Sequence, residues 1–240
     1  MNIIKYIAIF FFDLIDKFFH QRKILKEIKK NSVNIETFMD VGSHRGTYTD
    51  LILKNFKTKK VFMFEPQKKI FKKIKSKYLN KKYIKIFNVA VSSKNKFSEI
   101  FINEHDLTSS LNKLNNKNIY LNYKSKIFGG SVNAMIKKSY KIKTIKLSNL
   151  ISKKKIKKID LLKVDTEGHE LEVLIGLEKY IGLTRHILIE FHNDNVYLKY
   201  DSAKIHKYLI KNNFILKKIL KFPFTTWEDR IYSNKKQIFN

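Results

Sequence analysis

Short apolar runs alternate with segments of helical spacing over the first part of the chain. The runs 35–41, 60–64 and 83–91 predict buried strands, and the apolar positions of 46–56 and 67–78 fall on one face of a helix. Short strands that alternate with helices of this length are typical of a parallel sheet with right-handed crossovers. The pattern therefore predicts an α/β fold with helices on both faces of the sheet.

The alternation breaks after this part of the chain. Segments 97–102 and 141–147 alternate between apolar and polar positions with a period of two, which predicts an antiparallel pair at the edge of the sheet or above it. Between them, residues 103–140 are mostly polar. Long irregular excursions of this kind are usually lids or mobile loops, so we expect this segment to be an insertion that determines substrate specificity.

The regular pattern then resumes and continues almost to the end of the chain. It predicts strand 159–165, helix 169–180, strand 186–191, helix 201–212 and strand 214–222. The last strand, together with residues 230–232, suits a closing β-hairpin. Because no internal repeat or low-complexity linker interrupts the chain, we predict one domain, residues 33–240, preceded by a helical extension, residues 1–32.

The N-terminal residues 3–19 are strongly apolar, but Lys5, Asp13 and Asp16 interrupt them. A membrane-spanning helix needs about twenty residues with few or no charges, and the segment lacks the small-residue cleavage site of a signal peptide. Two interpretations stay open: an amphipathic helix docked on the domain, or an interfacial membrane anchor beside the basic residues 22–30. The second interpretation predicts peripheral contact with the inner face of a membrane.

Composition and charge change this picture in two ways. The formal net charge of +29 suggests nucleic-acid binding, but only four of the fifty cationic residues are arginine, the usual residue for phosphate and base contacts. The lysines are spread along almost the whole chain, so we expect no nucleic-acid partner, and the charge would favour anionic substrates or membranes only in a general way. The absence of cysteine excludes disulfides and thiolate metal sites and fits a cytoplasmic location. The sequence does not indicate an oligomeric state.

The stretch 37–46 reads as a strand that ends at an acid, followed by a glycine-bearing turn and a helix start. The next strand ends on Glu65, and a carboxylate at that place suits the two hydroxyl groups of a ribose. The turn lacks the middle glycine of a dinucleotide fingerprint, whereas Asp40 could meet an ammonium group. These features favour S-adenosylmethionine as the cofactor, with a side chain near the end of the third strand, at residues 88–90, on its adenine.

Five segments carry a family resemblance, in order and spacing: Asp40–Thr49, Phe64–Pro66, Asn88–Val91, Ser109–Leu111 and Ile159–Glu170, of which the last is the most specific. With them the sequence resembles the FkbM-type methyltransferases over roughly residues 35–235. His44 stands where that family often has asparagine. The resemblance implies a class I S-adenosylmethionine-dependent methyltransferase (Rossmann-like) fold. Such a fold has a seven-stranded, mostly parallel sheet whose last strand is antiparallel. The resemblance also implies transfer of a methyl group, usually to a hydroxyl.

Ligands of open α/β sheets bind beyond the carboxyl ends of the strands, and this rule selects the candidate residues. The candidates for the cofactor are Asp40, Gly42, Ser43, Gly46, Glu65, Asn88 and Ala90. The candidates for catalysis are Asp165, Glu167 and His192, and those for the acceptor are Ser109, Ser110 and Glu190. His192 has the side chain best suited to a general base near neutral pH.

These assignments have alternatives. Asp165 and Glu167 also suit the N-terminal cap of the helix that follows them, and a lone histidine at a strand end is as often structural. Asp165, Glu190 and His192 together could instead hold a divalent cation that acidifies the acceptor hydroxyl. Lys163, inside an otherwise apolar strand, needs a carboxylate or backbone partner if it is buried.

The predicted function is O-methylation of a hydroxyl group on a sugar, a glycan or another small metabolite, where the glycan setting follows from the resemblance alone. A metal-assisted reaction and methylation of another acceptor atom are the alternatives among enzymes. Methylation of nucleic-acid bases is disfavoured. An asparagine-proline-proline-aromatic loop after the fourth strand would indicate methylation of base amino groups, but this chain has Asp165–Gly168 at that place. The alternative from another class is a membrane-associated binding module that keeps the fold and has lost catalysis.

Overall fold

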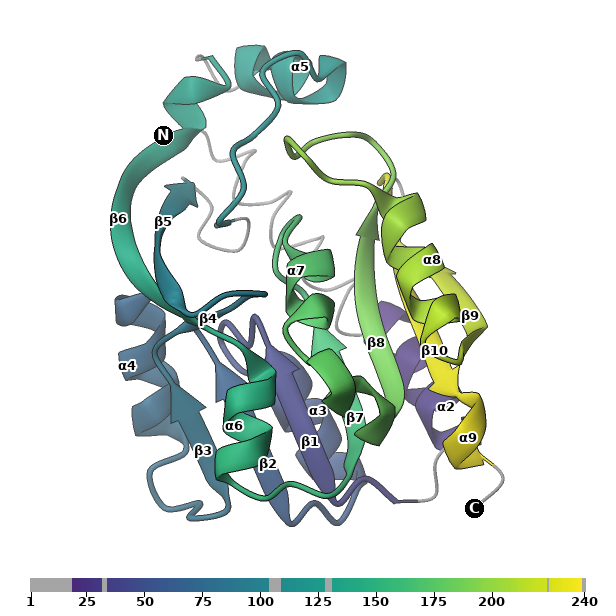
Figure 1. Ribbon diagram of the computed structural model, residues 1–240. Coiled ribbons are helices and arrows are strands. Elements are labelled where there is room, and N and C mark those ends of the chain that lie inside the picture. Colours follow the sequence, from purple (N-terminus) through teal and green to yellow (C-terminus); the bar gives the residue numbers. More distant parts are fainter. Residues whose placement is uncertain (1–18, 32–33, 104–108, 128–130, 224, 239–240) are drawn as a thin grey trace.

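The computed structural model describes residues 19–31, 34–103, 109–127, 131–223 and 225–238. Its centre is a seven-stranded sheet (Figure 1). Across the sheet the strands are β3 (Ile84–Phe87), β2 (Lys60–Phe64), β1 (Thr37–Val41), β7 (Ile159–Val164), β8 (Thr184–His192), β10 (Trp227–Asn234) and β9 (Phe214–Lys221). Neighbouring strands are parallel, except that β10 runs antiparallel to β8 and β9. The predicted sheet, mostly parallel with its last strand antiparallel, is confirmed.

Alternate residues of the central strands face two separate hydrophobic cores. Met39 and Leu162 belong to the core on one face of the sheet, and Phe38 and Leu161 belong to the core on the other. All four are at most 1% exposed. Strands that are buried on both faces are apolar at nearly every position, which is why continuous apolar runs identified them in the sequence.

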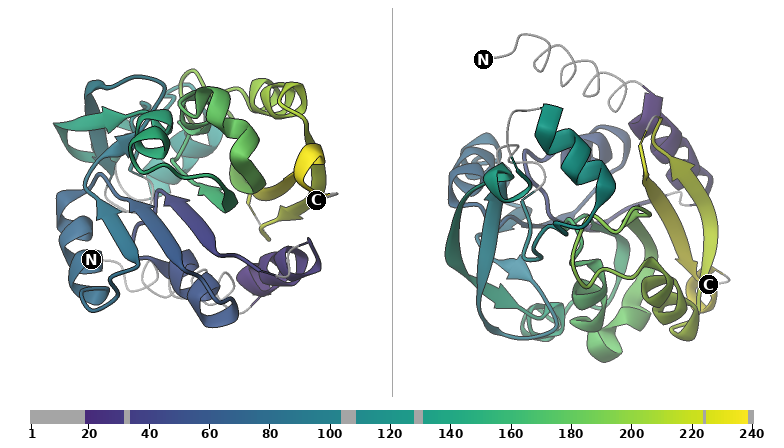
Figure 2. Two further views of the ribbon diagram at one scale, coloured as in Figure 1. Left: turned by 60° about the horizontal axis from the view of Figure 1, so that its bottom comes forward. Right: turned by 90° about the horizontal axis from the view of Figure 1, so that it is seen from above.

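Helices cover both faces of the sheet, as Figure 2 shows from two sides. On one face lie α2 (Gln21–Asn31), α3 (Thr47–Asn55) and α4 (Lys68–Lys77), which contribute Ile24, Ile28, Ile52 and Ile74 to the core. On the other lie α6 (Leu147–Lys153), α7 (Glu170–Ile175) and α8 (Ser202–Lys211), which contribute Leu150, Leu174 and Leu209. The short helix α9 (Lys235–Ile238) follows the last strand.

One predicted strand, residues 83–91, forms two strands of different sheets. β3 ends at Phe87, and β4 (Ala90–Val91) pairs with β6 (Ile136–Ile145) in a separate sheet of order β4-β6-β5. Between them the side-chain amide of Asn88 donates to the backbone carbonyls of Glu65 at 2.9 Å and Pro66 at 3.0 Å. The prediction of one continuous strand is wrong, because these hydrogen bonds hold Asn88 at the end of β2 and interrupt the strand pairing. An apolar run in the sequence does not reveal such bonds.

The predicted antiparallel pair is confirmed as β5 (Lys96–Asn103) with β6. Its second strand begins earlier than expected and ends at Ile145, so that Leu147 begins α6 instead of completing the strand. The helix predicted over 169–180 is also shorter. It ends at Ile175, and the chain continues as the 3-10 helix η4 (Glu178–Leu183).

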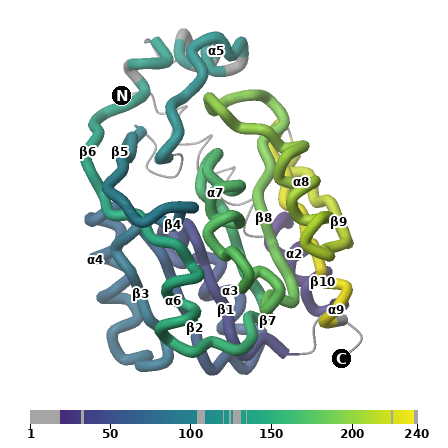
Figure 3. Tube along the Cα trace, in the orientation of Figure 1, coloured from purple at the N-terminus to yellow at the C-terminus, as the bar shows by residue number. Residues whose placement is uncertain are grey.

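The segment predicted to be irregular, residues 103–140, is partly helical. It contains α5 (Ile119–Ile127) and the 3-10 helix η3 (Asn133–Met135), while 104–108 and 128–130 lie outside the described residues. An apolar cluster joins the segment to the loop after β8; its members are Leu114, Leu121, Val132, Val196 and Tyr197. Figure 3 shows the segment beside this loop, at the end of the molecule to which β8 points. We call the described residues 109–127 and 131–135 the roof segment.

The N-terminal extension is described only from residue 19 onward, and its helix α2 packs on the domain through Ile24 and Ile28. The predicted helix over residues 3–19 lies almost entirely outside the described residues. Its docking on the domain or on a membrane therefore stays a prediction. Within the part of the chain that the structure describes, no helix is long and apolar enough to cross a membrane.

His186 gives the stability of the fold a pH dependence. Burial, assisted by the charge of Arg185, lowers the pKa of His186 to about 4 in the folded chain, while an exposed histidine titrates near 6.5. The stabilising contribution of neutral His186 is therefore complete above about pH 6.5 and is lost as the pH falls toward 4. Between pH 7.5 and 5 we expect wild type to lose about 2 kcal/mol of unfolding free energy that His186→Gln does not lose. Urea unfolding at both pH values measures this difference, and parallel pH curves for the two proteins would contradict it.

Candidate functional site

A cavity of about 1200 Å³ lies at the carboxyl ends of β1, β2, β7 and β8, beneath the roof segment. Ligands of open α/β sheets bind at this position. Most of the predicted site residues line it: Gly42, Ser43, Glu65, Ala90, Ser109, Ser110, Asp165, Glu167, Glu190 and His192. Asp40, Gly46 and Asn88 are not part of the wall, but the structure gathers most of the candidates around one space.

The turn after β1 is held tightly between β2 and β7. The backbone N–H groups of Gly42 and Ser43 both donate to the carbonyl oxygen of Phe64, at 3.1 Å each. Gly42 has φ +78°, and a Cβ atom there would lie 1.7 Å from the carbonyl oxygen of Asp165. Only glycine lets the ends of β1 and β7 approach so closely, and this approach brings both turns into one wall of the cavity.

Glu65 follows the last residue of β2 and is 2% exposed. Its two carboxylate oxygens accept the backbone N–H groups of His44 at 2.9 Å and of Gln67 at 2.7 Å. Asn88, which is exposed and off the cavity wall, holds the backbone carbonyl of Glu65. These bonds fix the carboxylate on the wall, and carboxylate oxygens accept more than one hydrogen bond each. The arrangement suits a ligand with two neighbouring hydroxyl groups.

Asp40 is the residue that was expected to meet the ammonium group of the cofactor. Its side chain is fully buried and accepts the hydroxyl proton of Thr49 at 2.6 Å, which ties β1 to α3. Burial raises the pKa of Asp40, and the nearby positive charge of Lys163 opposes that rise. A direct contact of Asp40 with a ligand stays a prediction, and the observed role of this side chain is to shape the turn from behind.

Lys163 is buried within β7, and its expected carboxylate partner is Asp165. The Lys163 Nζ atom lies 2.8 Å from Asp165 Oδ2 and 4.4 Å from the centre of the Tyr48 ring. Burial lowers the pKa of Lys163, but Asp165 and Asp40 outweigh this effect and raise it. Burial raises the pKa of Asp165, but Lys163 outweighs it and holds the pKa below its usual value. Both side chains are therefore charged at neutral pH, and Asp165 pairs with Lys163 instead of capping α7.

Replacing Lys163 with methionine is expected to lower the free energy of unfolding by about 2 kcal/mol at pH 7.5, because Asp40 and Asp165 lose the cation that balances them. The effect stays below that of a fully buried pair, since the Asp165 side chain is 30% exposed. The deficit should shrink toward pH 4, where protonation of the two carboxylates removes the unbalanced charge. Urea unfolding measures it, and an equal deficit at both pH values would refute this account.

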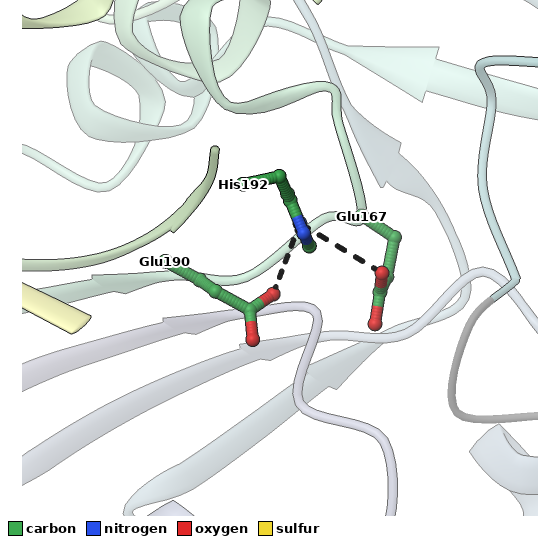
Figure 4. Close-up of side chains that lie close together, drawn as sticks. All are labelled: Glu167, Glu190 and His192. Carbon is green, nitrogen blue, oxygen red and sulfur yellow. Dashed lines mark ion pairs between the residues drawn. The ribbon is translucent and has the colours of Figure 1, made fainter. Parts of the chain in front are cut away.

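Glu167, from the turn after β7, forms a compact cluster with Glu190 and His192 at the end of β8, and their polar ends are turned toward one another (Figure 4). His192 Nε2 lies 3.3 Å from Glu190 Oε2 and 3.8 Å from Glu167 Oε2. Burial and the neighbouring Glu190 raise the pKa of Glu167 well above its usual value, and burial and Asp165 do the same to Glu190. Carboxyl groups with raised pKa values beside an imidazole can take up or release a proton during a reaction.

Three residues that sequence reasoning did not select hold this cluster in place. Tyr197 donates its hydroxyl to Glu167, and the rings of Tyr197 and Tyr200 pack edge-on against His192 at 5.1 and 5.5 Å. Glu170 accepts the backbone N–H groups of residues 166 and 168, at 3.0 Å each, and so shapes the β7–α7 turn. The sequence could have indicated Glu170, because this residue lies at a helix start. It could not have indicated the two tyrosines, which lie in a loop without periodicity.

The acceptor candidates Ser109 and Ser110 are the first residues of the roof segment and line the cavity. Ser110 donates its hydroxyl to the backbone carbonyl of Glu167 at 2.5 Å. Ser109 Oγ is buried and has no hydrogen-bond partner among the described residues. An aromatic wall, which the sequence did not predict, comes from Phe222 and Trp227, whose rings stack with their centres 4.1 Å apart. Apolar walls with a few polar groups are typical of small-molecule sites.

Comparison with known proteins identifies a family whose model matches this chain. The family model of the methyltransferase FkbM domain matches residues 40–216. The crystal structure of methyltransferase FkbM from Methylobacillus flagellatus KT is similar in fold, with a TM-score of 0.54 at 14% sequence identity over 83% of this chain and 43% of that chain. TrmK from M. capricolum, in complex with S-adenosyl-homocysteine, is similar with a TM-score of 0.50 at 9% identity over 89% of this chain and 68% of that chain.

At these identities the two structures establish a shared fold. The chain spans less than half the length of the Methylobacillus protein that it resembles. No curated protein matches the sequence.

Proposed function

The chain belongs to the FkbM methyltransferase family, and on that premise we propose that it transfers a methyl group from S-adenosylmethionine to a hydroxyl group of a sugar, a glycan or another small metabolite. The observation that carries the proposal is the fixed carboxylate of Glu65 on the wall of a cavity that also holds a proton-accepting cluster. One end of the cavity suits a nucleoside and the other suits proton removal.

The residues at the first end fit S-adenosylmethionine. Glu65 offers a carboxylate for the ribose hydroxyls, and the turn at Gly42 and Ser43 presents backbone beside it. Ala90, the first residue of β4, has a small, buried side chain on the cavity wall shortly after the end of β3, where an adenine would lie. The complex of TrmK with S-adenosyl-homocysteine supports this assignment, since that protein shares the fold.

The residues at the second end supply the chemistry of the acceptor. When bound, S-adenosylmethionine would supply a methyl group on a positively charged sulfur: the acceptor oxygen would form the new bond to the methyl carbon, the electron pair of the broken carbon–sulfur bond would stay on sulfur, and the hydroxyl would lose its proton. The cluster of Glu167, Glu190 and His192 receives that proton. Lys163 keeps Asp165 ionised, and the negative charge of Asp165 favours a sulfonium nearby.

The acceptor class rests on the roof and the aromatic wall. Ser109 and Ser110 place hydroxyl groups beside apolar residues of the roof segment, and Trp227 offers a ring face. Such a combination suits a molecule with several hydroxyl groups and an apolar ring face. We also propose a cytoplasmic location with peripheral membrane contact, supported by the exposed basic side chains of α2, which are Arg22, Lys23, Lys26, Lys29 and Lys30. We do not propose nucleic acid as a partner of this chain.

The test is methyl transfer from labelled S-adenosylmethionine to a panel of free sugars, glycans, lipid-linked glycans, small alcohols, amines and RNA. We expect label in methyl ethers of hydroxylated acceptors only. Calorimetric binding of the cofactor is measured in parallel. A folded wild-type protein that binds no S-adenosylmethionine refutes the enzymatic function, and transfer to amines or RNA alone refutes the acceptor class.

A further inference from the structure

Glu167, Glu190 and His192 place one ligand atom each within 4.8 Å of one another on the cavity wall. We propose that these three side chains bind a divalent transition-metal ion that also contacts the acceptor hydroxyl. The site differs from the group of Asp165, Glu190 and His192 considered on the sequence, because Asp165 is committed to Lys163. The contact with the hydroxyl rests on the proposed methyl transfer, whereas the binding of the ion does not.

Two atoms of the cluster lack hydrogen-bond partners although they are buried. His192 is 8% exposed and Glu190 is 9% exposed, yet His192 Nε2 and Glu190 Oε2 make no hydrogen bond within the described chain. Buried polar atoms that make no hydrogen bond cost free energy and are rare. Both atoms point into the same space (Figure 4), so that a cation between them would satisfy both.

The distances fit a metal ion after small side-chain movements. Ligand atoms about 2.1 Å from an ion, and at right angles to each other, lie about 3 Å apart. The observed separations from His192 Nε2 are 3.3 Å to Glu190 and 3.8 Å to Glu167. The surroundings hold the ligands in this arrangement, because Tyr197 bonds Glu167 and two tyrosine rings confine His192.

The charge around the cluster also favours a cation. Glu167 and Glu190 lie near Asp165, and the buried cation of this region, Lys163, is already paired with Asp165 at 2.8 Å. Glu167 further adopts a left-handed backbone conformation with φ 56°. Strain of this kind at a non-glycine residue is often retained for a function, and the Glu167 carboxylate lies 3.8 Å from His192 Nε2.

One imidazole nitrogen and two carboxylates select the class of metal. Calcium and magnesium prefer oxygen ligands alone, whereas Mn²⁺, Fe²⁺ and Zn²⁺ accept nitrogen with oxygen. Three protein ligands leave coordination positions open toward the cavity, as in catalytic rather than structural sites. A cation there lowers the pKa of a hydroxyl group that reaches it. Each carboxylate offers the ion one oxygen, so the second oxygen of Glu167 or Glu190 stays available for the proton that the hydroxyl loses.

Mn²⁺ is the probe, because its electron paramagnetic resonance signal falls when the free ion is bound. Protein treated with EDTA and dialysed is titrated with Mn²⁺ alone, without cofactor or acceptor. We expect one saturable site per chain, at least tenfold weaker binding of Mg²⁺ in competition, and at least tenfold weaker Mn²⁺ binding by Glu190→Gln and by His192→Gln. Glu178→Gln and His206→Gln change an exposed carboxylate and a histidine bonded to Tyr232, and should bind Mn²⁺ as wild type does.

Cofactor binding at Glu65 serves as the check that each variant is folded, with circular dichroism as a second check. Folded wild type without a saturable Mn²⁺ site, or site variants that bind Mn²⁺ like the controls, would overturn the proposal. Methyl transfer that persists unchanged in chelator would overturn the role of the ion while leaving the proposed function intact. Mn²⁺ binding without any binding of S-adenosylmethionine would have the reverse meaning: the metal site stands and the methyltransferase function fails.

Discussion

Glu65→Ala is expected to weaken the binding of S-adenosylmethionine at least about 100-fold, a loss of roughly 3 kcal/mol of binding free energy. Two effects combine in this variant. The ribose loses a charged acceptor for its hydroxyl groups, and hydrogen bonds to charged groups are among the stronger ones. The backbone N–H groups of His44 and Gln67 lose the carboxylate that holds the two neighbouring turns in place. Isothermal titration calorimetry with S-adenosyl-homocysteine measures the loss without turnover.

Two further variants separate these effects. Glu65→Gln keeps a carbonyl oxygen for one backbone N–H group and should lose less affinity than the alanine variant, because only the charge and one acceptor are removed. Glu99→Ala removes an exposed carboxylate that accepts a hydrogen bond from Ser139 at 2.5 Å, and should leave binding unchanged. If Glu65→Ala binds the nucleoside product like wild type, the cofactor does not lie at the end of β2.

The strands that carry the site could be predicted because they are buried on both faces. β1, β2 and β7 are apolar at most positions, and β8 has an apolar run at its centre, so these runs and their flanking helices were enough to place the strands. The rule that ligands bind beyond their carboxyl ends then selected Glu65, Asp165, Glu190 and His192, which the fold brings to one cavity.

The remaining features depend on contacts that a local pattern does not contain. Asn88 separates β3 from β4 through hydrogen bonds to residues 65 and 66, and nothing in its immediate sequence marks these partners. α5 lies in a polar segment whose apolar positions become meaningful only against Val196 and Tyr197 of a distant loop.

Asp40 and Tyr197 illustrate the same limit within the site. Asp40 was expected at a ligand because it ends a strand, but side chains of a strand alternate between faces, and its own points to Thr49 on α3. Tyr197 was not selected, because its role appears only when its hydroxyl reaches Glu167, thirty positions away in sequence. Strand-end position predicted which residues gather at the site, and side-chain direction decided what each one touches.

Gly42→Ala is expected to cost about 4 kcal/mol of unfolding free energy or more. Left-handed backbone geometry costs a non-glycine residue about 1–2 kcal/mol. The new Cβ atom would in addition lie 1.7 Å from the carbonyl oxygen of Asp165, an atom of the backbone that cannot rotate away as a side chain can. The ends of β1 and β7 must therefore separate, and this movement breaks the hydrogen bond from the Asp165 N–H to the Val41 carbonyl, at 3.0 Å in the native chain.

Gly182→Ala is the matched control, because a Cβ atom at Gly182 meets nothing within 4 Å and its backbone needs no left-handed conformation. We expect its unfolding free energy to lie within about 0.5 kcal/mol of wild type. In thermal unfolding, 4 kcal/mol corresponds to a decrease of roughly 10 °C in Tm for a chain of this size. Since Asp165 precedes the turn that carries Glu167, the separation of β1 from β7 should also weaken binding at both ends of the cavity. A Gly42→Ala protein as stable as Gly182→Ala would show that the two strand ends do not need their close approach, and with it the physical reason for the glycine would fail.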